Sequence, residues 1–200
     1  MTHYKPRLIK PVTIAFALLL ALPVSAQEKA KAYFAGGCFW CVEAAYQELD
    51  GVTDVVSGFT GGTLKNPTYK GNHQGHYEAV EVTYDASVIS YQQLLDVFWV
   101  NIDPFDAKGQ FCDKGPSYRS ALFVNNAAER ELAEQTKLKV EQEFPNHEVA
   151  TVILPSNTFY PVEEGHQDYY LKNPIRYKFY RSGCGRDRRL KQIWGDRAKH

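Results

Sequence analysis

Methionine is almost absent from this chain, since Met1 is the only one among the 200 residues. Once the N-terminal leader described below is removed, no thioether remains that an oxidant could convert to a sulfoxide. This composition is compatible with a protein that works among oxidants.

An excess of charge is also absent, because 23 basic residues balance 23 acidic ones. The leader contains three of the basic residues and none of the acidic ones, so the remaining chain has 20 against 23. Such a balance gives no support for a nucleic-acid partner or an anionic membrane surface. One local basic cluster, interpreted as the solvated face of a helix, consists of Arg186, Arg188, Arg189 and Lys191.

Long apolar runs are absent except near the N-terminus, where residues 12–22 follow Lys5, Arg7 and Lys10. This run is only about half of the ~20 residues that a membrane-spanning helix needs. Val24-Ser25-Ala26 resembles a cleavage site, so we interpret residues 1–26 as a signal peptide removed after Ala26. We therefore expect an exported protein, periplasmic in a bacterium, with no membrane attachment after cleavage.

Repeats, low-complexity stretches and long linkers are absent too, which predicts one domain over residues 27–200. Apolar periodicity predicts interleaved strands and helices with long loops between them. We expect an α+β fold, a single compact domain of two layers with a small mixed sheet, flanking helices and long functional loops. The predicted strands are 32–35, 52–59, 79–84, 119–124 and 148–154, and the predicted helices are 39–49, 90–99, 126–144, 163–171 and 186–194.

Cysteines are few, at positions 38, 41, 112 and 184. In an exported chain an even number favours disulfides, which competes with a catalytic interpretation. Cys38 follows two glycines and precedes a helical pattern, and the positive end of a helix dipole favours a thiolate. Phe39 and Trp40 give this thiol an apolar wall, and Cys41 gives it a partner that could resolve an oxidised state.

The run Gly37-Cys38-Phe39-Trp40 is followed, in order, by several further blocks that resemble the A-type peptide methionine sulfoxide reductases. The resemblance extends from about residue 31 to residue 174. The other blocks are Gly58-Phe59-Thr60-Gly61-Gly62, Asn66-Pro67-Thr68-Tyr69, Gly75-His76-Tyr77-Glu78-Ala79-Val80, Tyr118-Arg119-Ser120-Ala121, His166-Gln167-Asp168-Tyr169 and Lys172-Asn173-Pro174.

The resemblance implies a reaction in which the Cys38 thiolate attacks the sulfoxide sulfur. Phe39 and Trp40 are implied to hold the substrate's S-methyl group, since sulfur and aromatic rings attract each other by ~0.3–1.5 kcal/mol. Glu78 is implied to protonate the sulfoxide oxygen, which requires a pKa raised by burial.

Three further residues correspond to polar groups of the family's site. Tyr69 and Tyr118 are implied to donate hydrogen bonds to the sulfoxide oxygen. Asp113 matches a polar residue that positions water or substrate, and a loop-capping role is an alternative for it.

Attack by Cys38 leaves a sulfenic acid, which a second cysteine must convert to a disulfide. Many family members have glycine at the position of Cys41 and a resolving cysteine in a C-terminal tail, so this chain differs. In one interpretation, which we favour, Cys41 resolves Cys38 while Cys112 and Cys184 form a structural disulfide. In the other, Cys184 resolves Cys38 and the remaining cysteines take part in recycling.

The resemblance also implies preference for the S epimer of methionine sulfoxide, free or in proteins, and repair of exported proteins. It implies no metal or other cofactor, but an external thioredoxin-like dithiol as reductant, and we expect a monomer. The alternative enzyme is a thioredoxin-like thiol–disulfide oxidoreductase that uses Cys38 and Cys41. A metal-binding module fits the sequence less well, because one C-x-x-C lacks the paired spacing of a structural zinc site. A disulfide-stapled binding domain is the alternative that is not an enzyme.

Overall fold

The computed structural model describes residue 1 and residues 29–198. The predicted signal peptide and its cleavage site therefore lie outside the described residues, apart from Met1. The strands are β1 (Lys29–Gly36), β2 (Val52–Thr60), β3 (Tyr77–Asp85), β4 (Gly109–Gln110), β5 (Asp113–Lys114), β6 (Ser120–Val124), β7 (Val152–Pro155) and β8 (Tyr160–Pro161). The α-helices are α1 (Phe39–Tyr46), α2 (Tyr91–Val100), α3 (Ala127–Glu143), α4 (Tyr169–Lys172), α5 (Pro174–Gly183) and α6 (Arg186–Trp194), with 3-10 turns at Pro116–Tyr118, Glu164–His166 and Gly195–Arg197.

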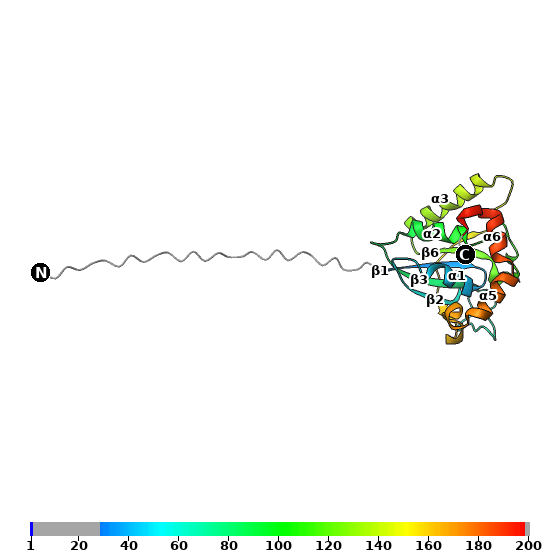
Figure 1. The fold of residues 1–200 in the computed structure, drawn as a ribbon, viewed down its shortest axis with the longest axis horizontal. Helices are drawn as coiled ribbons and strands as arrows, with labels where there is room; N and C mark the ends of the chain where they lie inside the picture. Colours follow the sequence, from blue (N-terminus) through cyan, green and yellow to red (C-terminus); the bar gives the residue numbers. More distant parts are fainter. Residues whose placement is uncertain (2–28, 199–200) are drawn as a thin grey trace.

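Six strands form one mixed sheet in the order β7-β6-β1-β3-β2-β8 (Figure 1). Neighbouring strands are antiparallel except β6 and β7, which run parallel. β4 and β5 form a separate two-stranded hairpin. The predicted α+β domain with a mixed sheet and flanking helices is confirmed.

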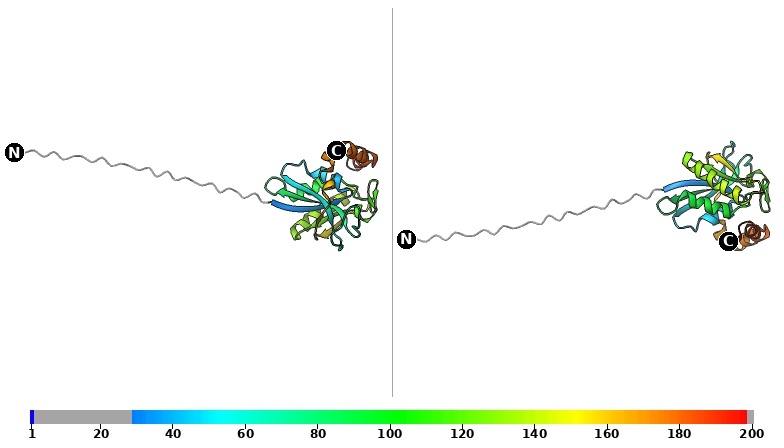
Figure 2. Two further views of the ribbon diagram at one scale, coloured as in Figure 1. Left: turned by 90° about the horizontal axis from the view of Figure 1, so that it is seen from below. Right: turned by 90° about the horizontal axis from the view of Figure 1, so that it is seen from above.

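The sheet has two different faces because side chains alternate along each strand. Phe34, Val80 and Leu122 point to the main core, which α1, α2, α3 and α6 complete. Ala35 and Phe123 lie on the other face, in a smaller cluster covered by Phe159 from a loop. Both views of Figure 2 show α3 (yellow-green) and α5 (orange) on opposite sides of the molecule.

The predicted helix over 163–171 is wrong in its larger part, where the chain forms a 3-10 turn followed by the short α4. The Gln167 side chain bonds the backbone of Ser57 in both directions, at 2.8 Å each, and so ties this segment to β2. Asp168 then adopts a left-handed backbone with a φ of 53°, which a continuous helix does not allow. The predicted strand at 148–154 begins only at Val152.

The C-terminal part contains the unpredicted helix α5 and the predicted α6. Pro174 begins α5, where its missing N–H has no helical partner to lose. A disulfide between Cys112 and Cys184 joins the turn after α5 to the β4–β5 hairpin. None of the helices within residues 29–198 is long and apolar enough to cross a membrane.

The interpretation of the basic cluster on α6 as a solvated face needs correction. Arg186 is only 2 % exposed, and Arg189 pairs with Asp103 at 2.6 Å. Arg188, Arg189 and Lys191 are exposed as expected, so the correction concerns Arg186.

Candidate active site

A glycine turn at the end of β1 sets the position of Cys38. Gly37 has a φ of 87°, and a Cβ atom there would lie 2.6 Å from the Cβ of Gln110. Glycine is therefore required both for the backbone conformation and for the close approach. α1 begins directly after this turn, so Cys38 occupies its N-cap position and is 5 % exposed.

β3 brings Glu78 to the same point. β1 and β3 pair Phe34 with Val80, so continuing the register sets Glu78 level with Gly36. The side chain of Glu78 points to the same face of the sheet as that of Val80, toward the helices. Its Oε2 accepts a hydrogen bond of 3.2 Å from the Phe39 N–H. Its Oε1 is buried without a hydrogen-bond partner within residues 29–198.

Burial keeps Glu78 in its protonated form near neutral pH. Desolvation is the main cause that raises its pKa to about 8, and the Phe39 N–H opposes this shift. Negative charge at Asp113 raises the pKa further, whereas the nearby Tyr118 hydroxyl lowers it. The carboxyl group therefore has the protonation state that a proton donor needs.

Tyr69 and Tyr118 stay protonated in this environment. Burial, followed by the charge of Glu78, raises the pKa of Tyr69 to about 12. The same two causes raise the pKa of Tyr118. Both hydroxyls can thus donate hydrogen bonds throughout the physiological range.

Aromatic rings surround Trp40. The ring of Tyr169 stacks on it with 3.8 Å between centroids and 8° between planes, and His166 stacks at 5.7 Å. Tyr69 lies 6.3 Å from Trp40 and 4.0 Å from His166. Phe39 is fully buried behind this group, with its ring 5.9 Å from that of Tyr69.

The thiols of Cys38 and Cys41 form a buried pair. Desolvation, then hydrogen bonding and repulsion with Cys41, raises the pKa of Cys38. Hydrogen bonding with Cys38 and the charges of Arg186 and Arg181 lower the pKa of Cys41 to about 6, against the opposing effect of burial. The sequence predicts that the helix N-terminus favours a thiolate on Cys38, but burial outweighs that effect. The two opposite shifts in pKa favour a resting state in which Cys38 keeps its proton and Cys41 is the thiolate.

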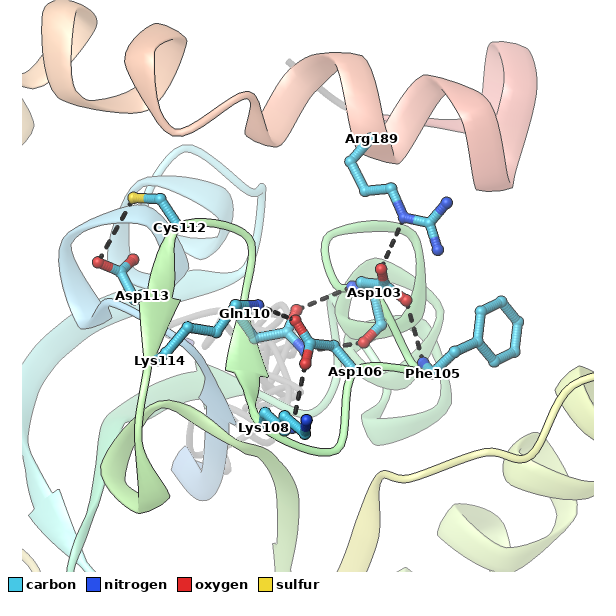
Figure 3. Close-up of polar contacts among 9 residues, drawn as sticks. All are labelled: Asp103, Phe105, Asp106, Lys108, Gln110, Cys112, Asp113, Lys114 and Arg189. Atoms are coloured by element: carbon cyan, nitrogen blue, oxygen red, sulfur yellow. Dashed lines mark hydrogen bonds and ion pairs between the residues drawn. The ribbon is translucent and has the colours of Figure 1, made fainter.

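Asp113 and Tyr180 connect this pair to the disulfide. The Tyr180 hydroxyl donates to Asp113 Oδ2, and its proximity opposes the rise in the pKa of Cys38. Asp113 Oδ1 lies 3.7 Å from Cys112 Sγ (Figure 3). The Cys112 and Cys184 sulfurs and the Asp113 carboxylate lie within 4.8 Å of one another, yet sulfurs joined in a disulfide are not thiolate ligands for a metal.

The structure thus brings Cys38, Cys41, Glu78, Tyr69, Tyr118, Phe39, Trp40 and Asp113 together, and Cys112 and Cys184 adjoin them through Asp113. Sequence reasoning assigned no role to His166, Tyr169, Tyr180 or Arg186. The first two lie in a block that carries the resemblance, which is a signal for them. Tyr180 and Arg186 lie beyond the resembling blocks, in a segment that only the tertiary fold brings to the thiols.

Comparison with known proteins agrees with this geometry. Residues 30–198 match the family model described as peptide methionine sulfoxide reductase. The peptide methionine sulfoxide reductase MsrA 2 of Caulobacter vibrioides is 48% identical over 194 residues, covering 94% of this chain and 98% of that protein. MsrA of Bacillus licheniformis is 48% identical over 174 residues, covering 85% and 96%.

Solved structures show the same similarity. Reduced Mxr1 from Saccharomyces cerevisiae is 30% identical with a TM-score of 0.66, covering 74% of this chain and 87% of that one. Methionine sulfoxide reductase A of Corynebacterium diphtheriae is 30% identical with a TM-score of 0.65, covering 80% and 81%. Mxr1 in complex with Trx2, at 24% identity and a TM-score of 0.51, covers 75% and 91% and shares the fold.

Proposed function

This chain belongs to the peptide methionine sulfoxide reductase family, and we propose that Cys38 and Cys41 together reduce the S epimer of methionine sulfoxide. The chain is a peptide-methionine (S)-S-oxide reductase, and its family supports a role in protein repair. The observation that carries the proposed chemistry is a buried, protonated Glu78 held by the Phe39 N–H beside a thiol pair.

In the first step, the proton of the Cys38 thiol moves to the Cys41 thiolate. The Cys38 thiolate formed in this way attacks the sulfoxide sulfur. Glu78 gives its proton to the sulfoxide oxygen, and the unpartnered Oε1 supports direct contact with that oxygen. The oxygen and this proton end on Cys38 as a sulfenic acid, and the substrate leaves as methionine with two more electrons. Glu78 is left as the carboxylate.

Tyr69 and Tyr118 stabilise the oxygen as its charge changes during this step. Their raised pKa values keep both hydroxyls protonated, which supports the role of donor. Trp40 with its stacked neighbours forms an apolar surface that accepts the S-methyl group, and Phe39 backs the site. Asp113, held by Tyr180, is assigned to the substrate backbone or a bound water.

In the second step, Cys41 resolves the sulfenic acid. Its sulfur attacks Cys38, an S–S bond forms and the S–O bond breaks, and the hydroxyl leaves as water with the Cys41 proton. The two thiols have then lost the two electrons that the substrate gained. Two observations support this assignment: Cys41 is a free, buried thiol one helical turn from Cys38, with its N–H donating to the Cys38 carbonyl at 3.0 Å. The bond between Cys184 and Cys112 disfavours Cys184 as the resolving thiol.

Turnover then needs an external dithiol that reduces the Cys38–Cys41 disulfide and becomes a disulfide itself. Yeast Mxr1 has been captured with Trx2, and we propose a donor of this thioredoxin-like class here. We also propose that the protein acts as a monomer on free and protein-bound sulfoxide after export, which its leader pattern supports.

The test is single-turnover methionine formation from the separate S and R sulfoxides, with pre-reduced protein and with Cys38→Ser. We expect methionine from the S epimer alone, and none from Cys38→Ser. Turnover of insulin disulfides without sulfoxide reduction would instead favour the thiol–disulfide oxidoreductase.

A further inference from the structure

Glu43 is a buried carboxyl group on α1 to which the mechanism above gives no part. It lies one helical turn after Trp40 and is 0 % exposed. Its Oε1 accepts a hydrogen bond of 3.0 Å from the Asp168 N–H, which joins α1 to the segment before α4. Desolvation raises the pKa of Glu43 to about 7, and the Asp168 N–H opposes this shift. Because a carboxylate and a protonated carboxyl group both offer an acceptor oxygen, the bond can form on either side of that value.

Asp168, the residue that Glu43 binds, has an uncommon backbone conformation. Its φ of 53° is in the left-handed region, which a residue other than glycine keeps only where its surroundings hold it. Gln47 supplies a second contact, since its Nε2 donates to Asp168 Oδ1 at 2.8 Å. Glu43 and Gln47 are four residues apart, the spacing at which helical side chains are neighbours. One side of α1 therefore fixes both the backbone and the side chain of Asp168.

The position of Asp168 sets the rings that surround Trp40. Tyr169 follows directly, begins α4 and is 7 % exposed, and its ring stacks on that of Trp40 with 3.8 Å between centroids. His166 lies two residues before Asp168, and its ring stacks on Trp40 at 5.7 Å. Trp40 itself belongs to α1. Both sides of this aromatic contact are thus held by one helix, which begins directly after Cys38.

Gln167 provides a separate tie in another direction. Its side chain bonds the backbone of Ser57 at 2.8 Å in both directions and so holds the segment on β2. That tie sets the segment against the sheet, whereas the contact of Tyr169 with α1 depends on Glu43 and Gln47. We therefore expect a change at these two residues to alter the aromatic surface while the segment stays on the sheet.

We propose that Glu43, with Gln47, is a positioning residue for substrate selection, which keeps the aromatic surface shaped for a methyl group on the sulfoxide sulfur. Its bond to the Asp168 N–H fixes Tyr169 against Trp40. The inference rests on the proposed role of Trp40 and its stacked neighbours in accepting the S-methyl group. Without the acceptor on α1, the left-handed turn relaxes, the two rings separate and the surface loses its fit to methyl. The role requires an acceptor and not a charge, so glutamine can replace Glu43.

The experiment compares two substrates that differ by one methylene: the S epimer of methionine sulfoxide and the corresponding epimer of ethionine sulfoxide, whose sulfur carries an ethyl group. The readout is the ratio of their kcat/KM values with dithiothreitol as reductant. An apolar pocket distinguishes one methylene by about 10- to 200-fold, and we expect the parent to prefer the methyl substrate to this extent. Glu43→Leu keeps the apolar volume, removes the acceptor and should lower the preference by about 5-fold or more. A general loss of active protein lowers both kcat/KM values equally and leaves their ratio unchanged.

Three further variants separate the contact from its surroundings. Glu43→Gln retains an acceptor and should keep the preference of the parent. Glu48→Gln removes an exposed acid just after α1 and should keep it too. Gln47→Ala, at a half-buried position, removes the second contact and should lower the preference by a smaller factor.

The inference is overturned if folded Glu43→Leu keeps the preference of the parent, if folded Glu43→Gln loses it, or if the parent shows no preference. Where Glu43→Leu does not fold, Gln47→Ala decides, and an unchanged preference in that variant overturns the inference. A parent that reduces neither sulfoxide would instead contradict the proposed function.

Discussion

At the scale of single residues, burial and neighbouring charges together set the protonation state of each ionisable group near Cys38. Desolvation keeps Glu78 protonated, and it keeps Tyr69 and Tyr118 as hydroxyl donors. Hydrogen bonding with Cys38, followed by the cations Arg186 and Arg181 of the C-terminal segment, lowers the pKa of Cys41 despite its burial. An acid and a thiolate therefore coexist at neutral pH within one small site.

The pH profile of single-turnover methionine formation tests this combination. The thiolate is present above the Cys41 pKa of about 6, and the acid is present below the Glu78 pKa of about 8. We expect the rate to rise through the first value and to fall through the second. Glu78→Gln should lower the rate and remove the fall at high pH. A rate that keeps increasing well above the pKa of Glu78 would rule out a protonated Glu78 as the donor.

The tyrosine hydroxyls allow a second test at this scale. Tyr118→Phe should lower the single-turnover rate by about 100-fold, the usual effect of losing one donor to a developing oxyanion. Tyr160→Phe is the matched control, because this half-buried ring packs on His76 away from the thiols. Equal rates for the two variants would show that Tyr118 makes no contribution to the chemical step.

At the scale of elements, the C-terminal helices form one wall of the site. α5 contributes Tyr177, Tyr180 and Arg181 at helical spacing, and α6 contributes Arg186. Cys184 lies in the turn between the two helices and is bonded to Cys112 on the β4–β5 hairpin. The disulfide therefore holds the residues that contact both thiols.

Removal of this disulfide in Cys112→Ser/Cys184→Ser should affect stability and activity together. Its sequence separation is 72 residues, and loop-closure entropy for such a separation contributes about 4 kcal/mol. Thermal unfolding should therefore occur roughly 10 °C lower. The rate of Cys38–Cys41 disulfide formation should also fall at temperatures where the variant is folded. An unchanged melting temperature and an unchanged rate would show that the disulfide supports neither the fold nor the site.

Local sequence predicted most elements, since their signals are local. The Ser90 side chain accepts from the Gln93 N–H and the Gln93 side chain caps in return, as the predicted capping box requires. The prediction of a helix over residues 163–171 was wrong because the conformation of this segment depends on the hydrogen bonds of Gln167 to β2, more than a hundred residues away. Periodicity alone likewise could not tell that Arg186 lies inside, because that depends on how α6 packs under the Gly36–Gly37 turn.

At the scale of the whole molecule, the site draws on both ends of the described chain. The turn after β1 provides Cys38, α1 provides Cys41 and β3 provides Glu78, while the last two α-helices provide the cations and Tyr180. Motifs identified Cys38 and Glu78, since each lies in a block that resembles the family. Tyr180 and Arg186 needed the fold, because nothing in their local sequence marks them as neighbours of Cys38.

The most direct test of the account is peptide mapping of disulfides after one turnover with S-sulfoxide. The starting protein has the Cys112–Cys184 disulfide intact and the Cys38–Cys41 pair reduced. We predict one methionine for each enzyme, a new Cys38–Cys41 disulfide and an unchanged Cys112–Cys184 disulfide. A disulfide between Cys38 and Cys184 would contradict the account, because it would make Cys184 the resolving residue.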